Sequence, residues 1–248
     1  MSDLDLNFPR AFGVPCAHGV IREKDTDFFV EEILPVSPTG TGTHCWLFLD
    51  NCGDNTAWIA RTLAEVAGVE RSAVSYCGLK DRHAWTRQWF SVDIAGKVMP
   101  DWRGLPASMA PLTVVRSARK LRRGIHRANH FRIVVRDLHG DPEALERKVA
   151  SVCQRGVPNY FGEQRFGHQL ANLELADAIL IRQKRIRDRH RRSLALSSAR
   201  SWIFNKVLAH RVRDSTWDRR LVGEWCIGAG VPTGPLWGAG DSRCDGIP

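Results

Sequence analysis

The stretch YCGLKDRHAWTRQWF, residues 76–90, sets one carboxylate among cations and follows it with aromatic residues. Asp81 lies between Lys80 and Arg82, and nearby positive charge favours the ionised form of a carboxyl group. An ionised aspartate in a fixed position can act as a nucleophile or as a general base. Asp81 is therefore the candidate for chemistry, although a polar loop with solvated charges has a similar composition.

Strands are predicted on both sides of this loop, at residues 72–76 and 88–94. A rigid sheet can present a loop residue at the end of a strand, so this placement suits a functional carboxylate. Upstream, residues 28–33 and 44–49 are rich in aromatic and β-branched side chains and are bounded by proline and glycine, which predicts two more strands.

Helices are predicted where apolar residues recur at helical spacing between cap signals. The first follows a possible cap at residues 54–56 and ends at Gly68, and the second runs from Asp141 to Gly156. After two further strands, at 112–115 and 130–135, the sequence beyond residue 156 is mainly helical, with a long helix at 196–212. An α+β protein is expected, with domains at residues 1–156 and 157–248.

The chain carries a formal net charge of +9, which favours a polyanionic partner. Residues 116–136 hold eight Lys or Arg and no acid, and residues 182–192 hold seven against one acid, Asp188. Such runs are typical either of solvated faces or of phosphate contacts. No apolar run reaches the roughly 18–20 residues that span a bilayer, and the N-terminus lacks a secretory pattern, so a cytoplasmic location is expected.

Cysteine and histidine residues give no signal for a metal or disulfide site. The seven cysteines are scattered without a Cys-x-x-Cys pair. His126 and His130 are four residues apart and could share one face of a helix. Their surroundings instead predict extended chain, so a metal pair is not expected. No metal is expected.

Four blocks, in order along the chain, resemble the tRNA pseudouridine synthase D (TruD) family. They are DFFVEE at residues 27–32, GLKDRHA at 78–84 with Gln88-Trp89, NHF at 129–131, and VPNYFGEQRFG at 157–167. Residues 197–201 and 232–240 also look like family segments, so the resemblance spans nearly the whole chain.

This resemblance implies a pseudouridine-synthase-type mixed or antiparallel sheet with flanking helices, followed by a mainly helical inserted domain. It also implies the isomerisation of a uridine to pseudouridine in tRNA, at position 13, without a cofactor. Asp81 stands at the position of the family's catalytic aspartate. Phe28 and Phe131 are candidates to pack near the base, Asn129 to orient Asp81 or the uracil edge, and Lys80 to bias the carboxylate charge. A tRNA partner is expected, with no membrane, no obligate protein partner and a monomeric state.

The chain departs from the family pattern at its C-terminal end. Family chains return from the inserted domain to complete the catalytic domain, whereas this sequence ends at Pro248. A partial inserted domain and a missing return segment are therefore expected. Two alternatives to an active enzyme follow: a protein that binds RNA without catalysis, or a nonfunctional fragment of a longer gene product.

Overall fold

The computed structural model describes residues 5–224, 226–227, 231–234 and 236. The chain divides into two compact units. The sheet unit is Ala17–His139, and the helical unit combines Met1–Cys16 with Gly140–Pro248. The family-like segment at 232–240 lies partly outside the described residues, at 235 and 237–240.

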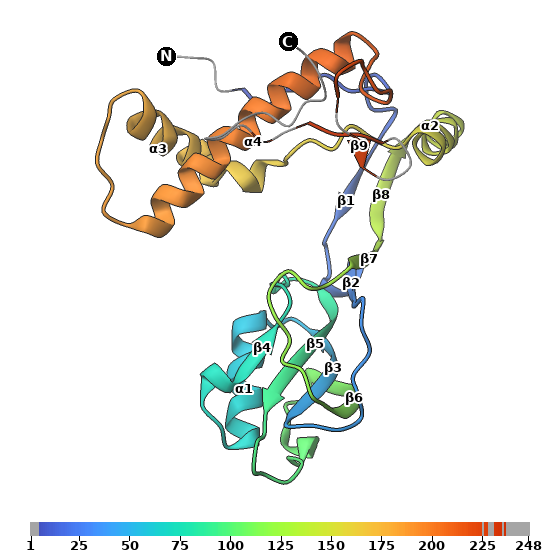
Figure 1. Ribbon diagram of the computed structural model, residues 1–248. Helices are drawn as coiled ribbons and strands as arrows, with labels where there is room; N and C mark the ends of the chain where they lie inside the picture. The colour runs from blue at the N-terminus through green and yellow to red at the C-terminus, as the bar shows by residue number, and fades with distance from the viewer. Residues whose placement is uncertain (1–4, 225, 228–230, 235, 237–248) are drawn as a thin grey trace. The chain divides into compact units, whose positions relative to one another are not determined.

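A mixed β-sheet forms the body of the sheet unit (Figure 1). Its strands are β2 (Phe28–Ile33), β3 (His44–Cys52), β4 (Val74–Tyr76), β5 (Trp85–Asp93), β6 (Met109–Ser117) and β7 (Ala128–Ile133). Their order is β6-β3-β5-β2-β7, and β4 also pairs with β5. The β2–β5 pair is parallel, whereas the other neighbours in this sheet are antiparallel.

Helix α1 (Thr56–Ala67) covers one face of this sheet (Figure 1). Asn55 begins it, because its side-chain oxygen accepts from the Trp58 N–H at 2.9 Å. Gly68 ends it with φ 60°, a left-handed conformation that glycine adopts without a Cβ clash. The core between helix and sheet includes Leu47, Leu49, Ile59, Leu63 and Phe90, each 1% exposed or less.

The opposite face of the sheet is covered by the chain that follows β6. The Trp46 indole N–H donates to the Arg119 carbonyl at 2.6 Å, and the Leu121 N–H donates to the Ser91 hydroxyl at 3.0 Å. Trp46 and Leu121 are each 1% exposed and lie in a second, smaller apolar cluster. Part of the first basic run is thus built into the fold.

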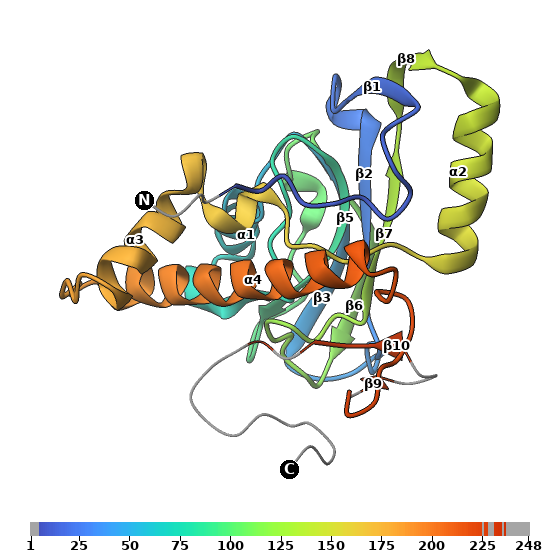
Figure 2. The same cartoon turned by 90° about the horizontal axis from the view of Figure 1, so that it is seen from above.

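A two-stranded ribbon completes the sheet unit. It pairs β1 (Ala17–Ile21) with β8 (Val135–Gly140), as Figures 1 and 2 show. Short 3-10 helices occur at Asp25–Asp27, Arg71–Ala73 and Trp102–Gly104. The Val134 N–H donates to the Asp27 carbonyl at 2.8 Å, which joins the start of the ribbon to the first of these turns.

The helical unit contains α2 (Pro142–Arg155), α3 (Ala171–Leu180) and α4 (Arg189–Arg213), with 3-10 helices at Glu163–Phe166 and His168–Leu170. Helix α3 packs against α4 (Figures 1 and 2). Asn205 on α4 is fully buried and bonds both backbone groups of Phe161, at 2.9 Å each. This amide fixes the segment that precedes α3 onto α4.

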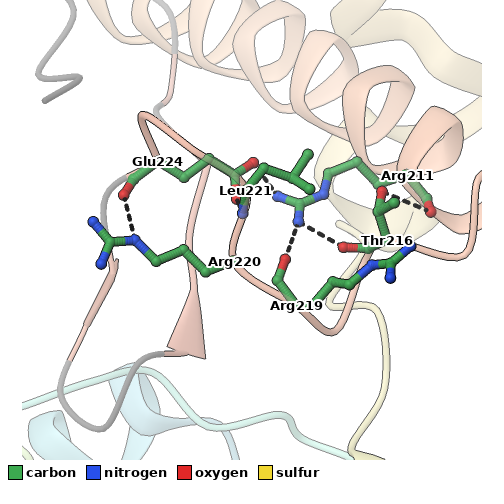
Figure 3. Close-up of polar contacts among 6 residues, drawn as sticks. All are labelled: Arg211, Thr216, Arg219, Arg220, Leu221 and Glu224. Atoms are coloured by element: carbon green, nitrogen blue, oxygen red, sulfur yellow. Dashed lines mark hydrogen bonds and ion pairs between the residues drawn. The ribbon is translucent and has the colours of Figure 1, made fainter. Parts of the chain in front are cut away.

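One guanidinium organises the chain after α4. Arg211 donates to the carbonyls of Thr216 and Arg219, at 2.6 and 2.5 Å, and it pairs with Glu224 (Figure 3). The other carboxylate oxygen of Glu224 accepts from the Leu221 N–H at 2.8 Å. Beyond this loop, β9 (Cys226–Ile227) and β10 (Val231–Pro232) pair antiparallel.

The α+β class is confirmed, and the strands and helices predicted around Asp81 are present. The contact boundary differs from the predicted one, because the two units separate at residues 139 and 140 and α2 belongs to the helical unit. Arg155, the last residue of α2, explains this: it bonds Asp218 at 2.6 Å and lies over the rings of Phe12 and Trp217. Whether the catalytic domain extends to residue 156 stays a prediction.

The buried Phe90 ring gives a direct test of the sheet core. Phe90→Ala should lower the free energy of unfolding by about 3–5 kcal/mol, since the ring leaves a cavity that its neighbours only partly fill. Hydrogen exchange of the β3 and β5 amides, read by mass spectrometry, should rise accordingly. Val98→Ala is the matched control, because Val98 is 85% exposed; equal exchange in both variants would contradict this placement of the core.

Candidate functional site

The sheet forks beside β5, and the Asp81 loop lies at this fork. One edge of β5 pairs with β2 at residues Trp85, Thr86 and Arg87. The same edge pairs with β4 further along, at Phe90, Ser91 and Val92. Two strands thus share one edge with a gap between them, and residues 77–84 leave β4 and return to β5 next to that gap.

The side chain of Glu32 occupies the gap. One carboxylate oxygen accepts from the Trp89 N–H at 3.3 Å, on the edge of β5 where the registers with β2 and β4 both leave Trp89 out. The other oxygen accepts from the Lys80 ammonium at 2.9 Å. The Glu32 and Lys80 side chains are 0% and 6% exposed, so this ion pair is buried. A buried carboxylate needs such partners, because desolvation without them is costly.

A second set of hydrogen bonds ties the loop to the sheet and to α1. The Gln88 side-chain N–H donates to the Gly78 carbonyl at 2.7 Å. Its oxygen accepts from the Thr56 hydroxyl at 3.1 Å, and that hydroxyl accepts from the Lys80 N–H at 2.8 Å. Gln88 and Thr56 are each 1% exposed. The loop is therefore held at Gly78 and Lys80, immediately before Asp81.

Asp81 itself is exposed and faces a cation. Its carboxylate lies 3.1 Å from the Arg22 guanidinium, and the two side chains are 48% and 42% exposed. Arg22 has φ 60°, which is uncommon for a residue with a Cβ and points to local backbone strain. The same guanidinium lies 3.9 Å from the centre of the Phe28 ring. One arginine thus joins the carboxylate to an aromatic surface.

Two phenylalanine rings extend this surface across the β2–β7 pair. Phe28 and Phe131 have ring centroids 6.0 Å apart at an angle of 55°. Phe131 lies opposite Val30 in the register, which makes Phe28 its diagonal neighbour on the same face. The Phe131 side chain is 52% exposed, so part of its ring is open to a ligand.

Asn129 lies on the same face and opposite Glu32 in the β2–β7 register. Its side-chain oxygen is inaccessible and has no hydrogen-bond partner among the described residues. The Nδ1 atom of His126 is likewise buried and has no hydrogen-bond partner among the described residues. The His126 ring lies beside the loop, since its Cε1 atom is 3.6 Å from the place that a Cβ at Gly78 would occupy. Unsatisfied buried polar atoms are rare and mark positions that a ligand or water can complete.

The structure therefore brings the five sequence-predicted residues to one region of the sheet unit. They are Asp81, Phe28, Phe131, Asn129 and Lys80. Lys80 is directed at Glu32, and the cation that faces Asp81 is Arg22. Sequence reasoning missed Arg22, which carries no signal that separates it from the other Lys and Arg residues. It also missed the part played by Glu32, whose position inside a strand of apolar residues was a usable signal.

Part of the first basic run is committed to structure. Arg136 pairs with the buried Asp27 through two hydrogen bonds of 2.7 Å. Arg132 lies over the rings of Phe29 and Trp85, at 5.0 and 5.5 Å. The prediction of phosphate contacts for this run therefore concerns its other exposed cations, Arg119, Lys120, Arg122, Arg123 and Arg127.

Neither a reactive thiol nor a metal site is found near the loop among the described residues. Burial raises the pKa of the Cys77 thiol to about 12, so the nucleophilic thiolate is scarce near neutral pH. Within residues 5–224 and the short described segments beyond, no cluster of three or more His, Cys, Asp or Glu side chains could hold a metal ion. The described helices include none that is long and apolar enough to cross a membrane.

Comparison with known proteins agrees with this geometry. The model of the tRNA pseudouridine synthase D (TruD) family matches residues 10–188. A tRNA pseudouridine synthase D from Cellvibrio japonicus is 46% identical over 244 residues, which cover 96% of this chain and 72% of the relative. One from Methylococcus capsulatus is 43% identical over 264 residues, covering 97% and 75%.

A crystal structure from Methanosarcina mazei, described as tRNA pseudouridine synthase D, has the same fold. Its TM-score is 0.69 at 20% identity, over 91% of this chain and 68% of that chain. The two proteins thus share an α+β fold. With the family match and the sequence relatives, it follows that the chain belongs to the tRNA pseudouridine synthase D family.

Breaking the buried ion pair should destabilise the fork. Lys80→Met leaves the Glu32 carboxylate buried without its cation, which costs on the order of 3–5 kcal/mol of unfolding free energy. Urea unfolding followed by tryptophan fluorescence measures this loss. Glu70→Gln is the control, since Glu70 is exposed and forms no side-chain hydrogen bond or ion pair with any residue that the structure describes. If Lys80→Met matched Glu70→Gln, the pair would not be holding the loop.

The Asp27–Arg136 pair gives a pH dependence. The hydrogen bond from Arg136 holds the pKa of Asp27 below its ordinary value of 3.8. The pair should therefore stabilise the fold fully above that value, and this contribution should disappear as pH falls through the lower folded pKa. Asp27→Asn should be less stable than the parent at pH 7 and approach it in acid. A constant difference in melting temperature down to about pH 2 would refute the assignment.

Proposed function

We propose that this protein isomerises a uridine of tRNA, at position 13, to pseudouridine, with Asp81 as the catalytic carboxylate. The observation that carries the proposal is an exposed aspartate that follows a residue fixed in a buried network and that Arg22 joins to an open aromatic surface. The family relationship supports the reaction, and the printed names of the relatives support tRNA as its substrate.

The reaction breaks the bond between uracil N1 and ribose C1′ and forms one between uracil C5 and C1′. Asp81 can attack C1′ and displace the base as an anion, or it can remove a ribose proton so that the base leaves. In both routes the detached base turns and its C5 bonds to C1′. In the first route the bond between Asp81 and C1′ breaks as this bond forms, and in the second Asp81 returns its proton to the ribose. The C5 proton is then lost, and N1 gains a proton. Product and substrate are isomers, so Asp81 is regenerated.

The detached base must be held while it turns. The exposed part of Phe131, with Phe28 beside it, offers a surface for stacking worth about 1–3 kcal/mol per base. That gain offsets part of the few kcal/mol needed to take a nucleotide out of its stack. Asn129 lies on the same face as Phe131 and is the candidate to orient Asp81 or the uracil edge.

Two cations support the carboxylate in different ways. Arg22 faces Asp81 directly and forms an ion pair with its carboxylate. Lys80 acts on the adjacent backbone, since its ammonium is fixed to Glu32 and its N–H to Thr56. Because Glu32 already balances the Lys80 charge, positioning is the main contribution of Lys80 to Asp81.

The test is conversion of tRNA uridine by the purified chain. Asp81→Ala and the isosteric Asp81→Asn should each lower the single-turnover rate by at least about 10³-fold, because neither can attack or take a proton. Carbodiimide labelling with primer extension shows the position of the product, and a tRNA with cytidine at position 13 should give none. Asp101→Asn, which changes an exposed carboxylate paired with Arg103, should keep the parent rate.

Conversion that survives Asp81→Ala would refute the role of Asp81. Tight tRNA binding by the parent and by Asp81→Ala, with no conversion by either, would instead favour a protein that binds RNA without catalysis.

A further inference from the structure

The turn between α3 and α4 surrounds a cavity of about 420 Å³. Four cations line it: Lys184, Arg185, Arg187 and Arg192. Ile179 and Ile186 provide apolar contacts within the same cavity. Its volume is within the range of sites that hold small ligands. We call these four cations the turn cluster.

The backbone fixes the shape of this turn. The Lys184 N–H donates to the Ala178 carbonyl at 2.8 Å, and the Arg182 N–H donates to the Asp177 carbonyl at 3.3 Å. Gln183 between them has φ 51°, which reverses the chain. Hydrogen bonds thus hold the chain on both sides of the reversal, so the cations are presented by a defined turn.

The acids nearest in sequence do not neutralise the turn cluster. Asp177 pairs with Arg182, outside the cluster, at 3.2 Å. Asp188 caps α4 by accepting from the N–H groups of His190 and Arg191 at 2.9 and 3.1 Å. Among the residues that the structure describes, none forms an ion pair with a member of the cluster, and all four members are exposed. Four like charges around one hollow repel one another, and an anion would relieve that repulsion.

We propose that the turn cluster binds the phosphodiester backbone of tRNA, with one nucleotide's phosphate and sugar seated in the cavity. This inference rests on the proposed function for the identity of the RNA and adds a docking site apart from Asp81. Three of the four cations are arginines, whose planar guanidinium matches two phosphate oxygens at once. Backbone contacts fix register without reading sequence.

A membrane surface is the competing polyanion, since Ile181, next to the turn, is 75% exposed. Helices that lie on membranes carry their cations along one face and their apolar residues along the other. Here the cations instead converge on a hollow, which suits a protruding phosphate better than a flat layer of headgroups. RNA is therefore the favoured occupant.

The test compares two triple variants with the same net charge. Arg185→Ala/Arg187→Ala/Arg192→Ala removes three cluster cations. Arg61→Ala/Arg103→Ala/Arg147→Ala removes three exposed cations outside the cluster. Both are made on Asp81→Ala, so that binding is measured without turnover. Filter binding of the family's tRNA substrate at several salt concentrations gives Kd and its salt slope.

The cluster variant should raise Kd by about tenfold or more and reduce the salt slope by about 2–3, because each lost phosphate contact removes nearly one unit. The control triple should change both much less. Arg185→Lys/Arg187→Lys/Arg192→Lys, which keeps the charges, should recover most of the slope. With Asp81 restored, the cluster variant should raise KM and leave the rate at saturating tRNA near that of the parent.

Equal losses in the two alanine triples would overturn the proposal, because binding would then follow net charge alone. Binding of phosphatidylserine vesicles by the parent that the cluster variant loses, with tRNA binding unchanged, would assign the cluster to a membrane. Failure of the catalytic proposal would give a different result. In that case Asp81→Ala would stay active, and tRNA binding would still lose its salt slope in the cluster variant only.

Discussion

The ion pair between Glu32 and Lys80 is the interaction on which the rest of the site depends. A sheet that forks leaves a backbone amide without a neighbouring strand, and a buried unsatisfied N–H is costly. One carboxylate oxygen of Glu32 accepts a hydrogen bond from that amide, and the other accepts one from the Lys80 ammonium. Lys80, the residue before Asp81, thus balances the charge that β2 buries at Glu32. The same ion pair closes the fork in the sheet and places the Asp81 loop.

The two basic runs differ physically although their sequences look alike. The first contributes Arg136 to a buried acid and Arg132 to two aromatic rings, so part of its charge is used within the fold. In the second, four cations surround a cavity, and the nearest acids bond Arg182 and the α4 backbone instead of these four. Charge density alone did not separate these cases, because the difference lies in which partners the fold supplies.

Local signals explain what could be predicted from the sequence. Asn55 and Gly68 bound α1, and Asp141 and Pro142 begin α2, because caps and turns depend on neighbouring residues. The family blocks made Asp81, Phe28 and Phe131 candidates for the functional site. Two features needed tertiary contacts: the fork beside β5, which only strand pairing reveals, and the approach of Arg22 to Asp81 across 59 residues of sequence. Helix α4 also begins earlier than the predicted residue 196, since Asp188 caps it.

The order of the two units along the chain affects how the protein is made. The sheet unit is continuous, whereas the helical unit needs Met1–Cys16 together with the chain from Gly140 onward. On a ribosome adding about 5–20 residues per second, the sheet unit can fold first. Phe8 stacks on Tyr160 in the folded protein, so its ring stays exposed to solvent until Tyr160 has been synthesised. The segment around Phe8 thus emerges before its partners exist, and it is open to chaperones and proteases in the interval.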